Sequence, residues 1–332
     1  MTACGGPARA DRMLPDRAAL EDAAALIARH MAPTPQIVWP LLSRRAGCDV
    51  VVKHENHTPI GAFKVRGGLV YLTKLREQQP CVRGVITATR GNHGQSVARA
   101  ATALGLACVI VVPEGNNPEK NAAMEAFGAE LIVHGHDFQA AAEFAHTLSA
   151  TRGLHFIPSY HPWLIAGVGT YAMELFTAHP DLDAVFVPIG MGSGISGLIA
   201  AKQALGLTTR IIGVVSEGAD AYLRSFLAGR VVTTETADTI ADGMACRSPD
   251  PQALEVILDG VANIVTVSDA QVCDAMSAYF TDTHNLAEGA GAAPLAALLA
   301  EHDAWAGRKV GLVLSGGNAD RALMREVLGL GR

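Results

Sequence analysis

One lysine in the segment 60–68 could carry out covalent chemistry. Lys64 follows the apolar run 50–52 and precedes a helical pattern over 69–75, so we expect it near a strand-to-helix junction. An uncharged amine condenses with carbonyl compounds, and burial lowers the pKa of a lysine toward neutrality. Because most lysines are solvated surface cations, Lys64 alone is weak evidence of function.

A glycine-rich segment at 190–197 could bind phosphate. It lies between the apolar run 184–189 and a helical pattern that starts near Ile195, and backbone N–H groups at such a junction can surround an anion. From Gly192 the segment also reads GxGxxG, and Glu217 lies at the end of the next predicted strand. A nicotinamide or flavin dinucleotide is therefore one alternative, and a glycine turn without a ligand is another.

A polar loop follows the predicted strand 84–88. It contains Thr89, Arg90, Asn92 and His93, and ligands of open α/β sheets bind at the carboxyl ends of strands. A hydroxyl, a guanidinium, an amide and an imidazole together suit a carboxylate. Taken singly, Asn92 could only form a left-handed turn and His93 could only start a helix.

Two further residues are candidates with weaker support. Ser315 follows the predicted strand 309–314 in a Ser-Gly-Gly-Asn segment that could also be a plain turn. Glu288 stands in a run of small residues, 286–293, that should pack tightly. A buried carboxylate needs a partner or a function, so Glu288 is a candidate as well.

The elements that must position these residues alternate along the chain. Apolar strands are predicted at 84–88, 107–112, 130–133, 184–189, 210–215 and 309–314, with helices such as 95–104, 118–127 and 138–150 between them. Strands that are continuous apolar runs indicate a parallel sheet covered on both faces. The fold class is α/β, with parallel-rich twisted sheets covered by helices, and 332 residues favour two lobes.

Composition restricts the partners. A net charge of −6 without a basic run gives no reason to expect nucleic acid or an anionic membrane as a partner, and no apolar stretch is long enough to span a membrane. The six cysteines lack metal-ligand spacing, which fits reduced thiols and a cytoplasmic protein. The N-terminal segment 1–14 lacks an apolar signal sequence, and its first ten residues suggest a loose tail.

Four segments in order resemble one enzyme family. They are Phe63-Lys64-Val65-Arg66-Gly67, Gly91-Asn92-His93-Gly94-Gln95, the glycine segment 190–194, and Ser315-Gly316-Gly317-Asn318. Together they resemble the fold-type II, tryptophan synthase β-like enzymes that use pyridoxal 5′-phosphate, within the branch of threonine and serine dehydratases and serine racemase. The dinucleotide alternative explains neither Lys64 nor the Asn92 loop.

The resemblance implies a two-lobed enzyme that forms a homodimer. Residues 1–83 and 156–332 would form the large cofactor-binding domain, and 84–155 a small mobile domain. The implied activity is an ammonia-lyase (dehydratase) that converts a β-hydroxy amino acid such as threonine, serine, 3-hydroxyaspartate or phenylserine into a 2-oxo acid and ammonia by α,β-elimination. The alternatives are a racemase or β-replacement enzyme on the same cofactor and, more distantly, a non-catalytic amino-acid-binding protein.

The resemblance also assigns roles to residues. Lys64 would bind the cofactor aldehyde and later take the α-proton as the general base. Phe63 would pack near the cofactor ring, Asn92 would contact its phenolic oxygen and Ser315 its pyridine nitrogen. The full set of expected cofactor-binding residues is Phe63, Lys64, Asn92, Gly190, Met191, Gly192, Ser193, Gly194, Glu288 and Ser315. The expected substrate-binding residues are Thr89, Arg90, Asn92 and His93.

Two departures from the family pattern change these expectations. Arg90 occupies the position at which the racemase has a serine acid/base, so racemisation is disfavoured. Arginine can instead bind a carboxylate through two hydrogen bonds, on the substrate side chain or on its α-carbon, or it could form an ion pair between lobes. The positions of the family's acidic metal ligands are Val215 and Ala221, so we predict that this site binds no metal.

Overall fold

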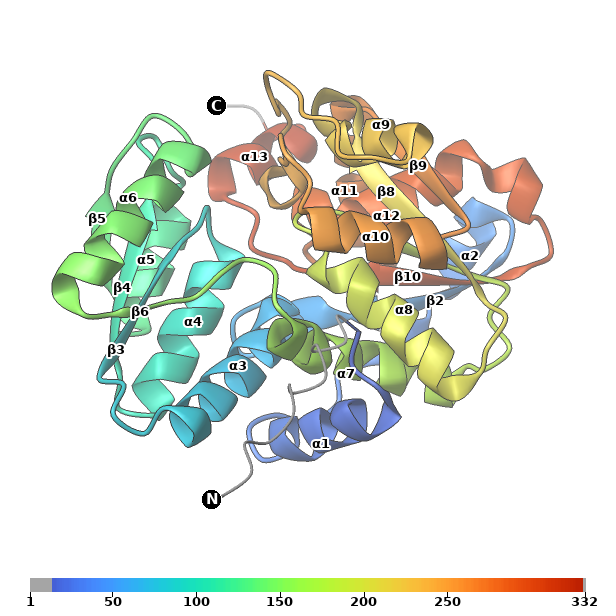
Figure 1. Ribbon diagram of the computed structural model, residues 1–332. Helices are drawn as coiled ribbons and strands as arrows, with labels where there is room; N and C mark the ends of the chain where they lie inside the picture. The colour runs from blue at the N-terminus through green and yellow to red at the C-terminus, as the bar shows by residue number, and fades with distance from the viewer. Residues whose placement is uncertain (1–13, 331–332) are drawn as a thin grey trace.

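The computed structural model describes residues 14–330, which form two lobes built on separate sheets (Figure 1). The expected loose tail and Cys4 lie outside the described residues. The larger sheet has six strands in the order β1 (Gln36–Val38), β2 (Asp49–His54), β10 (Lys309–Leu314), β7 (Ala184–Pro188), β8 (Arg210–Ser216) and β9 (Asn263–Val267). The smaller sheet has four, in the order β5 (Glu130–Val133), β4 (Ala107–Val112), β3 (Gly84–Ala88) and β6 (His155–Phe156).

Both sheets are parallel except at one edge. The strand β1 pairs antiparallel with β2, and every other pairing between the described strands is parallel. The predicted α/β class with parallel-rich sheets is therefore confirmed. The strand β6 pairs with β3 and spans residue 155, at which the expected small domain ends.

Helices cover both faces of each sheet, which explains the continuous apolar strands. In β2, Val50 and Val52 pack with α2, α11 and α12, whereas Val51 faces α1, α7, α8 and α10. In the smaller lobe α3, α4 and α5 cover one face and α6 the other. The helices are α1 (Arg17–Ile27), α2 (Pro40–Ala46), α3 (Lys64–Gln78), α4 (Asn92–Ala103), α5 (Pro118–Ala126), α6 (Phe138–Arg152), α7 (Pro162–Ala178), α8 (Ser193–Leu205), α9 (Ala221–Ala228), α10 (Pro251–Gly260), α11 (Asp269–Thr283), α12 (Gly289–Ala300) and α13 (Arg321–Val327).

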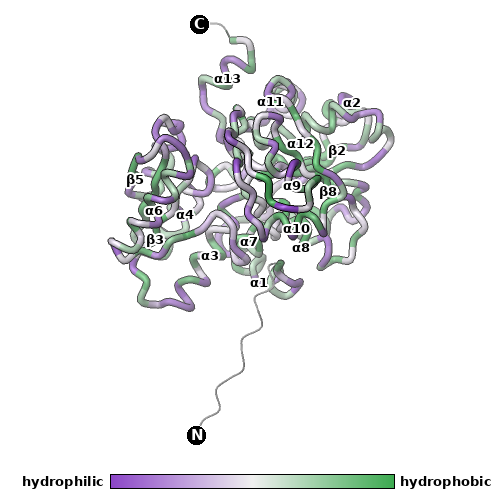
Figure 2. The backbone as a smooth tube through the Cα atoms, turned by 45° about the horizontal axis from the view of Figure 1, so that its top comes forward, coloured by the Kyte–Doolittle hydropathy of each residue, from purple (hydrophilic) through white to green (hydrophobic). Residues whose placement is uncertain are grey.

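The apolar segments run through the inside of the lobes. In Figure 2, green stretches such as β8 and α12 lie within the larger lobe, and many of the purple stretches lie on its outer loops. No helix within residues 14–330 combines the length and apolarity that a membrane span requires.

The predicted helix at 95–104 starts too late. The helix α4 begins at Asn92, because Gly91 precedes its first turn and the Gln95 amide donates to the Gly91 carbonyl at 3.1 Å. Asn92 and His93 therefore lie in the first turn of a helix, not in a loop. This correction fixes the direction in which both side chains point.

Candidate active site

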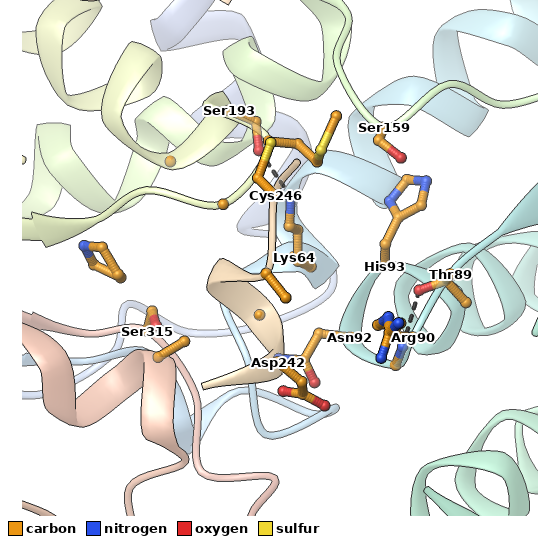
Figure 3. A pocket seen from close by; sticks show the side chains of 18 of the residues that line it. Lys64, Thr89, Arg90, Asn92, His93, Ser159, Ser193, Asp242, Cys246 and Ser315 are labelled. Carbon is orange, nitrogen blue, oxygen red and sulfur yellow. Dashed lines mark hydrogen bonds between the residues drawn. The ribbon is translucent and has the colours of Figure 1, made fainter. Parts of the chain in front are cut away.

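A pocket between the lobes brings together the residues that we expected to bind the cofactor and the substrate. It encloses about 940 Å³, its open mouth included, and its lining draws on both sheets. Figure 3 shows Lys64 and Ser193 on one side, with Thr89, Arg90, Asn92 and His93 on another. The predicted residues in the lining are Phe63, Lys64, Thr89, Arg90, Asn92, His93, Gly190, Met191, Gly192, Ser193, Gly194, Glu288 and Ser315.

Lys64 is the first residue of α3, and its side chain points into the pocket. Its Nζ donates a hydrogen bond to Ser193 Oγ at 2.8 Å and lies 5.1 Å from the centre of the Phe63 ring. Burial lowers the pKa of Lys64 to about 8, because the surrounding protein penalises the charged ammonium. A useful fraction of this amine is therefore uncharged near neutral pH.

Behind Lys64 lies a buried network of four charged side chains. Arg66 donates to both oxygens of Glu55 and to both oxygens of Glu174, and Lys53 also pairs with Glu174. Arg66, Lys53 and Glu55 are completely buried. Two cations and two anions balance each other here, so the network can fix the first turn of α3 without leaving a net buried charge.

The glycine segment forms a cradle of backbone N–H groups. Gly192 adopts a left-handed conformation with φ of 93°, and a Cβ on Gly190 would lie 2.2 Å from the carbonyl oxygen of Gly243. The helix α8 begins at Ser193, so the N–H groups of Ser193, Gly194 and Ile195 have no partners within the helix. The cradle lies beside Lys64, whose amine contacts Ser193.

Four helices begin at the pocket. Lys64 starts α3, Asn92 starts α4, Ser193 starts α8, and Glu288 immediately precedes α12. Each helix N-terminus carries a partial positive charge. The pocket therefore favours anionic groups even where no cationic side chain faces it.

Asn92 and Glu288 meet at the base of the pocket. Asn92 Nδ2 donates to Glu288 Oε1 at 2.6 Å, and Asn92 Oδ1 accepts from Asn318 Nδ2 at 2.8 Å. Glu288 is buried, which raises the pKa of its carboxyl, and its Oε2 has no hydrogen-bond partner within residues 14–330. The carboxylate that needed a partner thus has a hydrogen bond at Oε1, and its Oε2 lies within ion-pair distance of a lysine.

Lys120 and Asp242 also line the pocket, and our sequence analysis did not identify them as site residues. Lys120 Nζ donates to Asp242 Oδ2 at 2.6 Å and lies 3.8 Å from Glu288 Oε2. In the sequence, Lys120 is one polar residue of a predicted helix, and no motif identifies it as a site residue. Asp242 lies in the segment 239–243, outside the four segments on which our predictions were based.

The polar segment after β3 divides into three environments. Thr89 Oγ1 accepts from the amides of Gly91 and Gly94, so it holds the turn. His93 is buried, and no described residue forms a hydrogen bond with its Nε2. Burial, followed by the nearby charge of Lys64, lowers the pKa of His93 to about 3, so the ring stays neutral. Arg90 is exposed at the pocket and forms no ion pair or hydrogen bond through its side chain to any described residue.

Ser315 connects the end of β10 to the lysine segment. Its carbonyl oxygen accepts from the Phe63 amide at 2.9 Å, and its side chain lines the pocket. Glu217, which the dinucleotide alternative requires, is exposed on the short helix Glu217–Ala219 and is not part of the pocket lining. Val215 and Ala221 are buried apolar residues, as their types suggest.

Comparison with known proteins identifies the family. A family model described as "Pyridoxal-phosphate dependent enzyme" matches residues 27–316. The chain belongs to this family. The L-threo-3-hydroxyaspartate ammonia-lyase of Saccharomyces cerevisiae is 34% identical over 90% of this chain and 92% of its own length.

Solved structures of the family share the fold. A threonine deaminase from T.th. has a TM-score of 0.86 at 35% identity, covering 92% of this chain and 99% of its own. A pyridoxal 5′-phosphate-dependent aspartate racemase also has a TM-score of 0.86, at 30% identity, and covers 92% of this chain and 96% of its own. The family thus includes proteins with different reactions on one cofactor, and the reaction of this chain depends on its own residues.

The pocket fits pyridoxal phosphate on physical grounds. Lys64 supplies an amine of lowered pKa for the aldehyde, and the cradle at 192–195 supplies N–H groups for the phosphate beside it. Asn92 and Ser315 line the same pocket with polar side chains. The expected cofactor is therefore compatible with the donors that this chain presents.

Proposed function

We propose that this protein is an ammonia-lyase that converts a β-hydroxy amino acid into a 2-oxo acid and ammonia. The observation that carries the proposal is Lys64, an amine of lowered pKa between the Phe63 ring and the Ser193 hydroxyl, beside the cradle of backbone N–H groups. The named relatives that act on threonine and 3-hydroxyaspartate support the same reaction class.

The chemistry divides between the cofactor and the chain. When bound, pyridoxal phosphate withdraws electrons from the α-carbon of an attached amino acid. Lys64 then takes the α-proton and can return a proton to the β-hydroxyl, so that water leaves. The Lys64 amine would then replace the product nitrogen at the cofactor's aldehyde carbon and so release the unsaturated amine. Addition of water to this amine gives the 2-oxo acid and ammonia.

Ser315 favours elimination over reactions that need a long-lived carbanion. Our assignment places its hydroxyl at the pyridine nitrogen, where a neutral hydroxyl stabilises the protonated form of the nitrogen less than a carboxylate would. The ring then withdraws less negative charge from the α-carbon, so rapid loss of the β-hydroxyl is favoured over reactions that need a long-lived carbanion. His93 lines the same pocket with a neutral ring, and its buried Nε2 forms no hydrogen bond with any residue within 14–330.

Arg90 is our candidate for substrate selection. It lines the pocket mouth without an ion-pair partner among residues 14–330, so its guanidinium is available to a ligand. A free guanidinium binds a carboxylate with two hydrogen bonds. We therefore propose an acidic β-hydroxy amino acid such as 3-hydroxyaspartate as the preferred substrate.

The decisive experiment measures 2-oxo acid formation from threonine, serine, 3-hydroxyaspartate and phenylserine. Activity should be lost in Lys64→Ala, because no other described lysine contacts the cradle serine. Formation of the opposite stereoisomer without 2-oxo acid would instead support the racemase alternative. Binding of amino acids without either product would support the non-catalytic alternative.

Arg90→Ala tests the substrate preference, with Arg83→Ala as the matched control. Arg83 is exposed and precedes β3, whereas Arg90 follows the same strand at the pocket. Loss of a charge-assisted pair costs roughly 1.5 to 3 kcal/mol, so kcat/KM for 3-hydroxyaspartate should fall roughly 10- to 100-fold. An equal fall for threonine would show that Arg90 binds the α-carboxylate. No change for any substrate would refute a role in binding.

The finer organisation is also a proposal. We propose that residues 84–155 form a mobile domain that closes on the larger one, with contacts such as Lys120 to Asp242 and Asn117 to Asp320 holding the closed form. We propose a cytoplasmic location, which the free thiols of the five described cysteines support.

A homodimer is the expected assembly. Four large apolar side chains are exposed on β1, on α2, on α11 and in the segment after α11, and α2 packs against α11. They are Val38, Leu41, Phe280 and Leu286. Size-exclusion chromatography with light scattering tests the assembly, and a monomer at micromolar concentration would contradict it.

A further inference from the structure

The helix α7 lies against both helices that carry the cofactor site (Figure 1). Glycines allow close approach on both sides. A Cβ on Gly167 would lie 2.3 Å from the Arg66 carbonyl oxygen in α3, and a Cβ on Gly197 in α8 would lie 2.8 Å from the Gly169 amide. The backbone of α7 therefore touches the lysine helix and the cradle helix directly, and it sets the distance between them.

One side chain of α7 joins the two halves of the site. Tyr171 is completely buried, and its hydroxyl donates to the carbonyl oxygen of Gly194 at 3.0 Å. Its ring meets the Phe63 ring edge to face, with centroids 6.1 Å apart and an interplanar angle of 83°. Tyr171 thus contacts the cradle with its polar end and the neighbour of Lys64 with its apolar face.

The hydroxyl remains a donor at all working pH values. Burial is the largest cause that raises the pKa of Tyr171. A neutral phenol in a dry environment keeps its hydrogen bond to the carbonyl. The contact is therefore a fixed part of the site.

We propose that Tyr171 is a positioning residue that aims the cradle at the cofactor phosphate and keeps it in register with Lys64. The Gly194 carbonyl belongs to the same planar peptide as the Ile195 N–H, so holding one end orients the other. That N–H is one of the three at the start of α8 without a helical partner. The Phe63 contact ties this orientation to the residue immediately before Lys64.

This inference rests on the family's cofactor and not on the proposed elimination reaction. Its test is a binding measurement, so it can fail while the proposed function stands, and the reverse also holds. Tyr171→Phe removes the hydroxyl and keeps the ring against Phe63. Tyr279→Phe is the matched control, because Tyr279 is also completely buried and its hydroxyl has no hydrogen-bond partner within the described chain.

The experiment uses the full chain stripped of cofactor. Dissociation constants are measured for pyridoxal phosphate, for inorganic phosphate and for pyridoxal, which lacks the phosphate. Loss of one neutral hydrogen bond predicts about fivefold weaker binding of the two phosphate-bearing probes to Tyr171→Phe. Pyridoxal binding should stay within about twofold of the unmodified protein, and Tyr279→Phe should leave all three values unchanged.

Two outcomes would overturn the proposal. Unchanged affinity for pyridoxal phosphate and phosphate would show that the hydroxyl does not orient the cradle. An equal loss for all three probes would show a general structural role. If Tyr171→Phe is too unstable for titration, the rise in melting temperature that phosphate causes is compared with that caused by pyridoxal, and an unaltered phosphate effect would equally refute the role.

Discussion

The pKa of Lys64 makes a quantitative prediction about how the protein takes up its cofactor. Only the uncharged amine reacts with an aldehyde, and burial lowers the pKa of Lys64 to about 8 from 10.5. At pH 7, about 9% of the amine is then uncharged, against roughly 0.03% for an unperturbed lysine. The difference corresponds to a rate advantage on the order of 300-fold at neutral pH.

The rate of cofactor binding should increase with pH, because the pKa of Lys64 is lowered. Because the charged form is disfavoured, the uncharged fraction increases as pH rises through 8 and is nearly complete above about pH 9. The rate constant for binding of pyridoxal phosphate to the stripped protein should therefore increase about tenfold per unit below pH 7.5 and level off above pH 9. His93 adds no step in this range, since its pKa is lowered to about 3.

Stopped-flow absorbance measures this profile between pH 6.5 and 9.5. A parallel series with propylamine in place of the protein reports the ionisations of the cofactor itself, and Lys64→Ala should give no covalent signal. A protein profile that still rises at pH 9.5, as the propylamine series does, would refute the reasoning. Lys64 would then be an ordinary lysine in an open site.

Three further predictions concern the cradle, the buried ions and the metal. Gly190→Ala should abolish cofactor binding in an absorbance titration, because the new Cβ would lie 2.2 Å from the Gly243 carbonyl oxygen. In Gly194→Ala the new Cβ would make only ordinary contacts, with the Phe63 ring at 3.5 Å and the Tyr171 hydroxyl at 4.0 Å, so this variant should bind the cofactor at least tenfold better. Equal binding by the two variants would contradict this. Arg66→Met should lower the free energy of unfolding in urea by about 3 to 5 kcal/mol, since it leaves buried carboxylates without their main partner; a loss below 1 kcal/mol would mean that water replaces the guanidinium. Chelation with EDTA should leave the lyase rate unchanged, because we predict that no metal is required. A large loss of activity that is reversed by added magnesium would show that a metal is required.

The sequence predicted most of the sheets because their strands are buried on both faces. Runs such as 107–112 and 309–314 are apolar at nearly every position, and their bounds match β4 and β10. The candidate site residues could be selected because glycine, lysine and asparagine stand at strand ends, where parallel sheets place their ligands. Their convergence on one pocket follows from the parallel order of the strands.

The features that escaped prediction depend on contacts between distant segments. Lys120 becomes part of the pocket only because Asp242 lies 122 positions later on the opposite lobe. In the sequence, Tyr171 looks like one residue of a buried helix. Only the structure shows that its hydroxyl donates a hydrogen bond to the Gly194 carbonyl. The early start of α4 was missed because Gly91, which resembles a loop residue, precedes its first turn.

Because four helices begin at the pocket, its attraction for an anion does not depend on the net charge of the protein. The net charge is −6, yet the peptide dipoles at these helix starts favour a phosphate in the pocket, and surface substitutions leave those dipoles in place. Substitutions that change the surface charge, and with it the solubility, therefore leave this contribution to cofactor binding in place. The backbone contribution to phosphate binding therefore does not depend on the acidic residues of the surface.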